Sequence, residues 1–193
     1  MWVKEDGGAE FADVLVQPRR LTASGIAIGS IAHGYRLDYK LETRSDFITS
    51  GLLVTARGGG WSRRLDLRRL RSGRWTARTS CHGNAEMPAP GADMTAFDEA
   101  LDCDLALSPL TNSMPVLRHG LLDGGGPVDF LMAWVSVPDL SVHASRQRYT
   151  FLCKSGDISV VRYESESRDF VAELPFDADG LVIDYPGIGR RAR

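Results

Sequence analysis

Two carboxylates, an amide and a guanidinium group lie close together in the sequence, within residues 102–118. Asp102 and Asp104 are spaced so that they could supply an acid and a base, and Arg118 could stabilise an oxyanion. On a strand, however, side chains two residues apart share a face, and these carboxylates would repel each other unless a cation such as Arg118 lay near. Structural ion pairing is therefore the favoured interpretation, and acid–base chemistry is the alternative.

Two prolines bracket a polar stretch in the same segment. Pro109 and Pro115 flank residues 111–113, and each proline fixes φ and withholds a backbone N–H. The pattern predicts a fixed turn, not an ordinary helix or a central strand, followed by a strand over residues 115–122. Asn112 lies at the centre of this turn, either facing a ligand or tying the turn to nearby backbone, and the structural role is favoured.

A second group of candidate residues combines large side chains with hydrogen-bonding tips. Trp134, Gln147, Tyr149 and Tyr163 all fall in segments that alternate as strands do. Tyrosine and tryptophan present an apolar face and one polar tip, which suits the lining of a pocket for an amphiphile. The same residue types also suit an ordinary β core, and the sequence does not separate the two interpretations.

Arginine is concentrated in one hairpin-like stretch. Eight arginines lie from Arg57 to Arg78, and Trp61 and Trp75 lie among them. Guanidinium groups and indole faces could meet phosphate or a sugar ring. The favoured interpretation is the solvated outer face of a hairpin, with partly buried leucines at Leu65, Leu67 and Leu70.

The bulk composition excludes several classes of function. The chain has 23 basic and 25 acidic residues, which argues against a general binder of nucleic acid or membrane surfaces. Cys81, Cys103 and Cys153 form no CxxC pair, and the four histidines have no ligand spacing, so we expect no disulfide framework, metal or cofactor. Nucleophile-elbow, phosphate-loop and zinc-protease signatures are absent from the sequence, and no residue is assigned as catalytic.

The sequence also bears on location and domain organisation. The first eight residues lack a basic stretch followed by an apolar one, and no apolar run reaches the roughly 18 residues that span a bilayer. We therefore expect a cytoplasmic protein without a transmembrane segment. A length of 193 residues with 43% hydrophobic content predicts one domain over residues 1–193.

Strand signals dominate the chain. Over residues 35–44 apolar or aromatic side chains alternate with charged ones, which predicts an antiparallel strand with one buried face. Turn signals separate further strand candidates at residues 11–16, 21–32, 48–57, 63–70, 74–79, 115–122, 128–137, 147–153, 157–163, 169–174 and 180–185. One short helix is predicted over residues 93–101, with Asp93 as its N-cap. So many short strands predict a large antiparallel sheet that must curl, split or close.

Two stretches of the sequence echo each other. Residues 39–47 and 163–170 each end a predicted strand in a similar polar sequence and lead into another strand. Two related β halves and chance similarity between polar hairpins both account for this echo.

Several strings together resemble a known bacterial family. They include Ser-Pro-Leu-Thr-Asn-Ser-Met-Pro-Val-Leu-Arg over residues 108–118, with matching stretches at residues 101–105, 133–140, 147–150, 161–165 and 179–187. The sequence is similar to the family described as putative glycolipid-binding, formerly a domain of unknown function. The resemblance is strong over residues 101–187 and looser over residues 21–80.

The resemblance implies a fold and a class of ligand. It implies a curved, mostly antiparallel sheet that forms an incompletely closed barrel, like that of periplasmic lipoprotein carriers. It also implies a glycolipid or similar amphiphile as partner, held without catalysis in the concavity of the sheet, with apolar strand faces taking the acyl chain. The residues we expect at the ligand are Arg118, Asn112, Gln147, Tyr149, Tyr163, Trp134 and Asp104.

Two alternative functions follow from the residues already described. One is a hydrolase-type enzyme acting on a lipid or sugar conjugate, in which Asp102 or Asp104 is the acid or base and Arg118 holds the oxyanion. It requires a carboxylate, Asn112 and Arg118 to converge at the mouth of a pocket. The other alternative is a protein-interaction domain that uses exposed sheet edges or the arginine-rich hairpin.

Overall fold

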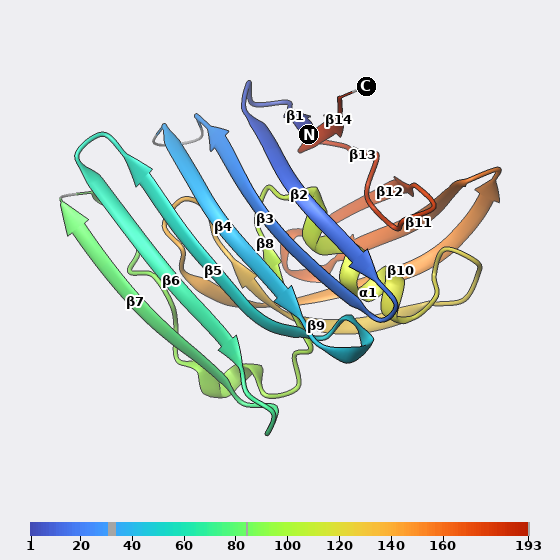
Figure 1. Ribbon diagram of the computed structural model, residues 1–193, viewed down its shortest axis with the longest axis horizontal. Helices are drawn as coiled ribbons and strands as arrows, with labels where there is room; N and C mark the ends of the chain where they lie inside the picture. The colour runs from blue at the N-terminus through green and yellow to red at the C-terminus, as the bar shows by residue number, and fades with distance from the viewer. Residues whose placement is uncertain (31–33, 84, 193) are drawn as a thin grey trace.

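The chain is mainly β, and its strands form two sheets (Figure 1). The computed structural model describes residues 1–30, 34–83 and 85–192. In these residues a nine-stranded antiparallel sheet, the large sheet, has the order β13 (Asp184–Tyr185), β14 (Gly189–Arg191), β1 (Trp2–Lys4), β2 (Ala9–Gln17), β3 (Arg20–Gly29), β4 (Tyr35–Thr43), β5 (Thr49–Gly58), β6 (Trp61–Arg69), β7 (Trp75–Gly83). A five-stranded sheet, the small sheet, has the order β12 (Phe170–Phe176), β11 (Ile158–Ser165), β10 (Val142–Ser155), β9 (Val128–Val135), β8 (Asp102–Leu105).

The side-chain alternation of β4 shows which face of the large sheet is buried. Its four apolar or aromatic residues point inward and are buried, and its charged residues point outward: Tyr35, Leu37, Tyr39 and Leu41 are the buried set. The predicted one-sided strand is therefore confirmed. The ring of Tyr39 lies directly over Gly25 of β3, where a Cβ atom would come within 2.4 Å of the ring. Glycine at this position thus lets the tyrosine lie flat on the sheet.

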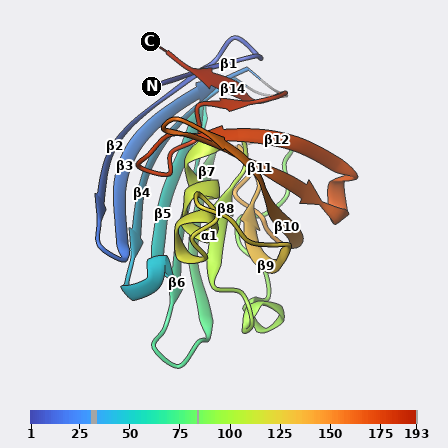
Figure 2. The ribbon, with the colours of Figure 1, turned by 90° about the vertical axis from the view of Figure 1, so that its right-hand side faces the viewer.

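The inner face of the large sheet packs against the small sheet. One core cluster contains side chains from both sheets, including Leu37 and Leu65 from the large sheet and Ala133 and Val135 from β9. In the side view the curved large sheet faces the small sheet, and the short helix α1 (Ser113–Arg118) lies beside β8, an edge strand of the small sheet (Figure 2). The concavity of the large sheet is therefore occupied by protein side chains.

The two sheets nearly join at one side and stay apart at the other. Phe176 at the end of β12 forms an isolated bridge with Val182, two residues before β13 begins. At the other side, β7 and β8 are the outermost strands of their sheets. The prediction of a large, curved, mainly antiparallel sheet that does not close into a barrel, with one short helix, is confirmed. β8 differs from its neighbours because it pairs with β9 in parallel.

The prediction of a strand over residues 115–122 is wrong. Residues Pro109–Asn112 form a 3₁₀ turn that continues into α1, and both prolines fall within first turns. A proline in the first turn of a helix loses no hydrogen bond, because the N–H groups there have no partner within the helix. The two prolines therefore begin helical turns, and Arg118 ends a helix instead of lying on a strand.

Three further predictions differ from the structure in extent. Asp93 is an N-cap as predicted, but the helix expected over residues 93–101 is only a 3₁₀ turn, Met94–Phe97. The strand expected over residues 180–185 is reduced to the bridge at Val182 and the two residues of β13. The strand expected over residues 21–32 corresponds to β3, which ends at Gly29, and residues 31–32 of the expected strand lie outside the described residues.

The two echoing stretches adopt similar local structures in different sheets. β4 leads through the 3₁₀ turn Ser45–Phe47 into β5, and β11 leads through the 3₁₀ turn Glu166–Arg168 into β12. Each turn contains or adjoins an aspartate with positive φ, Asp46 at 63° and Asp169 at 46°. The echo is therefore structural at the level of the turn, and a relationship between whole halves stays a prediction.

A buried carboxylate ties the large sheet to the segment that precedes α1. Glu10 of β2 is fully buried, and its Oε1 atom accepts hydrogen bonds from the Tyr39 hydroxyl at 2.6 Å and the Ser108 hydroxyl at 2.7 Å. Its Oε2 atom has no hydrogen-bond partner among the described residues. Burial raises the pKa of the Glu10 carboxyl, and the nearby Lys4 ammonium only partly opposes that rise.

The Glu10→Gln variant is expected to become more stable, relative to the wild-type protein, as pH rises. The folded state holds a proton on Glu10 that the unfolded chain releases above its ordinary pKa of 4.5. The wild-type free energy of unfolding therefore falls between that value and the raised native pKa, by at most about 1.4 kcal/mol per pH unit, and glutamine removes this fall. Urea unfolding of both proteins from about pH 4.5 to about pH 7.5 measures the difference. Glu173→Gln, at an exposed position of β12, is the control, and a difference independent of pH would contradict the prediction.

Candidate functional site

Asp104 is the centre of a buried hydrogen-bond network. Its Oδ1 atom accepts a hydrogen bond from the Thr111 hydroxyl at 2.8 Å, and its Oδ2 atom accepts one from the Gln147 side-chain amide at 2.7 Å. The Thr111 oxygen also accepts the backbone N–H of Leu105 at 3.2 Å. These bonds join β8, β10 and the 3₁₀ turn before α1, so the proline-bracketed segment is fixed to the small sheet from inside.

Asn112 and Tyr149 extend this network. The Tyr149 hydroxyl lies 2.8 Å from Asn112 Oδ1 and 3.0 Å from Gln147 Oε1, and all three side chains are buried. A phenol has one proton, so Tyr149 donates to one of these two oxygens at a time. Burial raises the pKa of Tyr149 far above its ordinary value, so the hydroxyl keeps its proton at physiological pH. Asn112 therefore ties the turn to β10 through the Tyr149 side chain, and its role toward a ligand stays a prediction.

Arg168 connects the remaining two aromatic candidates to the network. Its guanidinium donates to the Tyr163 hydroxyl and to the Ser165 hydroxyl, lies 5.3 Å from the centre of the Trp134 ring, and approaches Asp104 Oδ2 to 4.0 Å. Burial raises the pKa of Tyr163 to about 12. The side chain of Arg168 is 34% exposed, so the network reaches solvent at this residue. Arg168 was not among the residues predicted for the site, although it lies within one of the two echoing stretches.

Among the predicted ligand residues, Arg118 lies apart from the Asp104 network, in a buried ion pair with Asp102. Its guanidinium pairs with both carboxylate oxygens of Asp102, and the two side chains are 7% and 1% exposed. Burial raises the pKa of the Asp102 carboxyl, and the two N–H donors of Arg118 oppose that rise. Asn112 bonds to Tyr149 instead of this pair. These described residues therefore do not show the convergence that the hydrolase alternative required. They show the Asp102–Arg118 ion pair that was the favoured interpretation.

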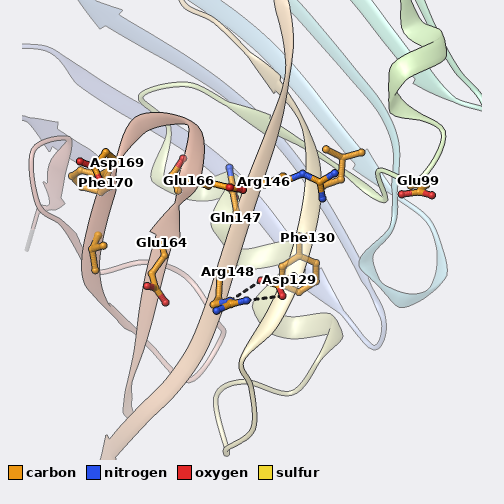
Figure 3. A pocket seen from close by; sticks show the side chains of 13 residues that line it. Glu99, Asp129, Phe130, Arg146, Gln147, Arg148, Glu164, Glu166, Asp169 and Phe170 are labelled. Carbon is orange, nitrogen blue, oxygen red and sulfur yellow. Dashed lines mark hydrogen bonds and ion pairs between the residues drawn. The ribbon is translucent and has the colours of Figure 1, made fainter.

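A cavity of about 710 Å³ lies against strands β9–β12, on the face of the small sheet opposite the buried Asp104 network (Figure 3). Asp129, Arg148, Glu164 and Val171 are register partners in successive strands β9, β10, β11 and β12, so they form one row across the sheet. The neighbouring row contains Gln147, whose side chain points inward to Asp104. The cavity and the network thus share the same strands and use opposite faces.

Charged side chains form most of the cavity wall. Arg148 Nε and Arg148 Nη2 donate to the two carboxylate oxygens of Asp129 at 2.7 and 2.9 Å, as Figure 3 shows. Arg146 extends from β10 toward the side on which Glu99 lies (Figure 3). The other carboxylates come from β11 and the turn after it: Glu164, Glu166 and Asp169. Such a wall offers hydrogen-bond donors and acceptors at several separate points, which suits a ligand that carries many hydroxyl groups.

The sequence analysis predicted little of this cavity. Of the seven predicted ligand residues only Gln147 contributes to its lining, and the others belong to the buried network or to the Asp102–Arg118 pair. The alternation of Arg146 and Arg148 around Gln147 was the available signal, because it places both arginines on the face opposite the amide.

The arginine-rich hairpin uses several of its arginines for internal contacts. Arg63 is buried and donates to the backbone oxygens of Pro88, Ala85 and Met87, which fixes the loop after β7. Arg69 donates to the backbone oxygen of Ala100. The expected partial burial of the leucines differs from the structure, because Leu65 and Leu67 are fully buried and Leu70 is exposed.

The described residues offer neither a membrane-spanning helix nor a cluster of metal-binding side chains. None of the helices in residues 1–30, 34–83 and 85–192 is long and apolar enough to cross a bilayer. The same part of the chain contains no group of three or more histidine, cysteine, aspartate or glutamate side chains placed to hold a metal ion.

Comparison with known proteins gives two matches. A model of the family described as "Putative glycolipid-binding" matches residues 1–191. The crystal structure of a DUF1089 family protein from Pseudomonas aeruginosa is similar over 95% of this chain and 92% of that one, with 28% sequence identity and a TM-score of 0.71. No curated protein matches the chain.

Proposed function

Because the chain belongs to the family described as putative glycolipid-binding, we propose that it binds a glycolipid or similar amphiphile in the cavity of the small sheet. The observation that carries this proposal is the combination of a 710 Å³ volume with a wall of hydrogen-bonding side chains on one face of β9–β12. Ligand pockets for small molecules fall in the range of about 300 to 1,000 Å³. The proposal contains no catalytic step.

Polar and apolar groups of the cavity have separate roles in this proposal. Arg146 and Glu164 exchange hydrogen bonds with the hydroxyls of the sugar head group. The start of the acyl chain lies against the apolar side chains of Leu131 and Val171. Val171 is 53% exposed and lies next to Glu164 in the row across the sheet. Covering Val171 with an apolar chain removes its surface from water, which favours binding.

The buried network has a positioning role in the proposal. Gln147 lies in the cavity lining and is fixed by Asp104, Thr111 and Tyr149 on the inner face. We assign the other predicted residues to the same support of β9, β10 and β11: Asn112, Tyr163, Trp134 and Arg118. We also propose that residues 1–193 form a single domain, because one core cluster contains side chains from both sheets.

The proposal predicts that octyl glucoside, used as a monomeric probe below its micelle concentration, binds the wild-type protein and binds the Arg146→Ala variant at least about fivefold more weakly. A hydrogen bond from a charged donor contributes about 1.5 kcal/mol or more, and its loss in the variant accounts for this difference. Isothermal titration calorimetry measures both affinities. Backbone amide shifts in β9–β12 of labelled protein locate the probe.

Arg78→Ala is the matched control, because Arg78 is an exposed, outward-facing arginine on β7 of the large sheet. Its affinity for octyl glucoside is expected to equal that of the wild-type protein. Equal weakening by both variants, or amide shifts confined to the large sheet, would contradict the proposed site.

A further inference from the structure

We infer, resting on the proposed function, that the cavity accepts a neutral or cationic head group and disfavours an anionic one. Its lining carries five carboxylates and two guanidinium groups, a net excess of three negative charges. This excess is local, because the whole chain has a formal net charge of only −2. A sugar without phosphate or carboxylate, or an amino sugar, is therefore the class of head group that the wall fits.

The two guanidinium groups differ in how far they are free to meet an anion. Arg148 is held by both oxygens of Asp129, and this hydrogen bonding keeps the pKa of Asp129 below its ordinary value and the pair ionised. Arg146 has no carboxylate within 4.0 Å among the described residues. Only one free guanidinium is thus available in the lining for an anionic group.

The carboxylates outnumber that free guanidinium on the facing walls. Glu164 has its own partner outside the cavity, Arg162 at 3.5 Å, whereas Glu99, Glu166 and Asp169 form no ion pair among the described residues. An anion at Arg146 would lie in the field of these three groups. Hydroxyl and ammonium groups would instead donate hydrogen bonds to them.

The size of this selectivity follows from the net charge. With Arg148 and Arg162 each paired to a carboxylate, the three unpaired carboxylates and the free Arg146 leave two net negative charges. At roughly 8 Å in a water-like dielectric these weaken the binding of a monoanion by about fivefold relative to a neutral ligand. Dissolved salt screens such interactions at these distances, so the difference shrinks at high ionic strength. A contact made by Arg146 alone would instead make the anion the preferred ligand.

Three probes with the same octyl chain test the inference: octyl glucoside, octyl sulfate and octyltrimethylammonium, each below its micelle concentration. Calorimetry at about 20 mM salt is expected to give octyl sulfate a dissociation constant about fivefold above that of octyl glucoside, with a smaller gap at about 300 mM. Octyltrimethylammonium is expected to bind at least as tightly as octyl glucoside. In the triple variant Glu164→Gln, Glu166→Gln, Asp169→Asn the gap is expected to close, because the acceptor oxygens remain and the charges do not.

The outcomes separate this inference from the proposed function. Octyl sulfate binding in the cavity as tightly as octyl glucoside would overturn the inference and leave amphiphile binding intact. A gap that persists in the triple variant would also overturn it, because the lining carboxylates would not then be its cause. If none of the three probes shifts the amides of β9–β12, the proposed function fails, and the inference fails with it.

Discussion

Replacing Asp102 by alanine is expected to lower the free energy of unfolding by about 3 to 5 kcal/mol, because it leaves the Arg118 guanidinium buried without its counter-charge. Arg118 donates through two nitrogens to Asp102, and its third nitrogen, Nε, has no hydrogen-bond partner among the described residues. No other carboxylate lies within 4.0 Å of it in that part of the chain. Urea or guanidinium unfolding, followed by far-UV circular dichroism, measures the loss.

Two further variants test whether the buried charge is the cause of this loss. Asp129→Ala breaks the equally bidentate but exposed pair with Arg148 and is expected to cost far less stability, because water screens this pair. The double replacement Asp102→Leu with Arg118→Met removes both charges and is expected to recover most of the lost stability. A cost for Asp102→Ala similar to that for Asp129→Ala would show that the buried charge is compensated in another way.

Truncating Tyr149 to alanine is expected to lower the free energy of unfolding by about 3 to 5 kcal/mol as well, because it empties the aromatic centre of the small sheet. The Tyr149 ring is 1% exposed and meets Phe130 and Tyr163 edge to face, with ring centres 5.5 and 5.2 Å away. The truncation also removes the hydroxyl that binds Asn112 and Gln147. Thermal and denaturant unfolding measure the combined loss.

A conservative change separates the two contributions. Tyr149→Phe keeps the ring and loses only the hydroxyl, so it is expected to cost about 1 to 2 kcal/mol. Phe11→Ala, which truncates an aromatic side chain that is 53% exposed on β2, is expected to change stability by no more than about 0.5 kcal/mol. A Tyr149→Phe variant as unstable as Tyr149→Ala would mean that the hydroxyl, not the ring, carries the stabilisation.

The sequence predicts the large sheet well for a physical reason. Its strands have one buried and one solvated face, so the apolar period of two residues is visible in segments such as Tyr35–Thr43. Short pieces without that period were not predicted. β1 and β14 are three residues each and pair with each other across almost the whole sequence, so no local pattern marks them.

The segment around α1 shows where local chemistry misleads. Pro109 and Pro115 argue against the interior of a helix, but a proline in the first turn is compatible with one, and sequence alone does not say which turn a proline occupies. Buried contacts with the rest of the protein determine which turn each proline occupies. Thr111 and Asn112 bond to β8 and β10, and those partners lie up to 37 residues away in the chain.

The sequence predicted a cluster of polar and aromatic side chains better than it predicted the position of the cavity. Gln147 is bonded to Asp104 and Tyr149, as the resemblance implied for residues of one site, but the side chains face the interior. The cavity depends on the register of four strands, which sets Arg148 opposite Asp129 and Glu164. Register is a tertiary property, and one residue of slip would turn the charged row to the other face.

The pairing of β1 with β14 also determines when the protein can finish folding during synthesis. The Trp2 indole donates to the backbone oxygen of Val182, and Arg191 lies 5.7 Å from the centre of its ring. The hairpins from β2 to β7 can pair as soon as they leave the ribosome, because their partners are neighbours in the chain. Trp2 and Val182 are 180 residues apart in the chain, so their hydrogen bond forms only after the intervening strands have been synthesised. Until then the Trp2 indole lacks its native hydrogen-bond acceptor.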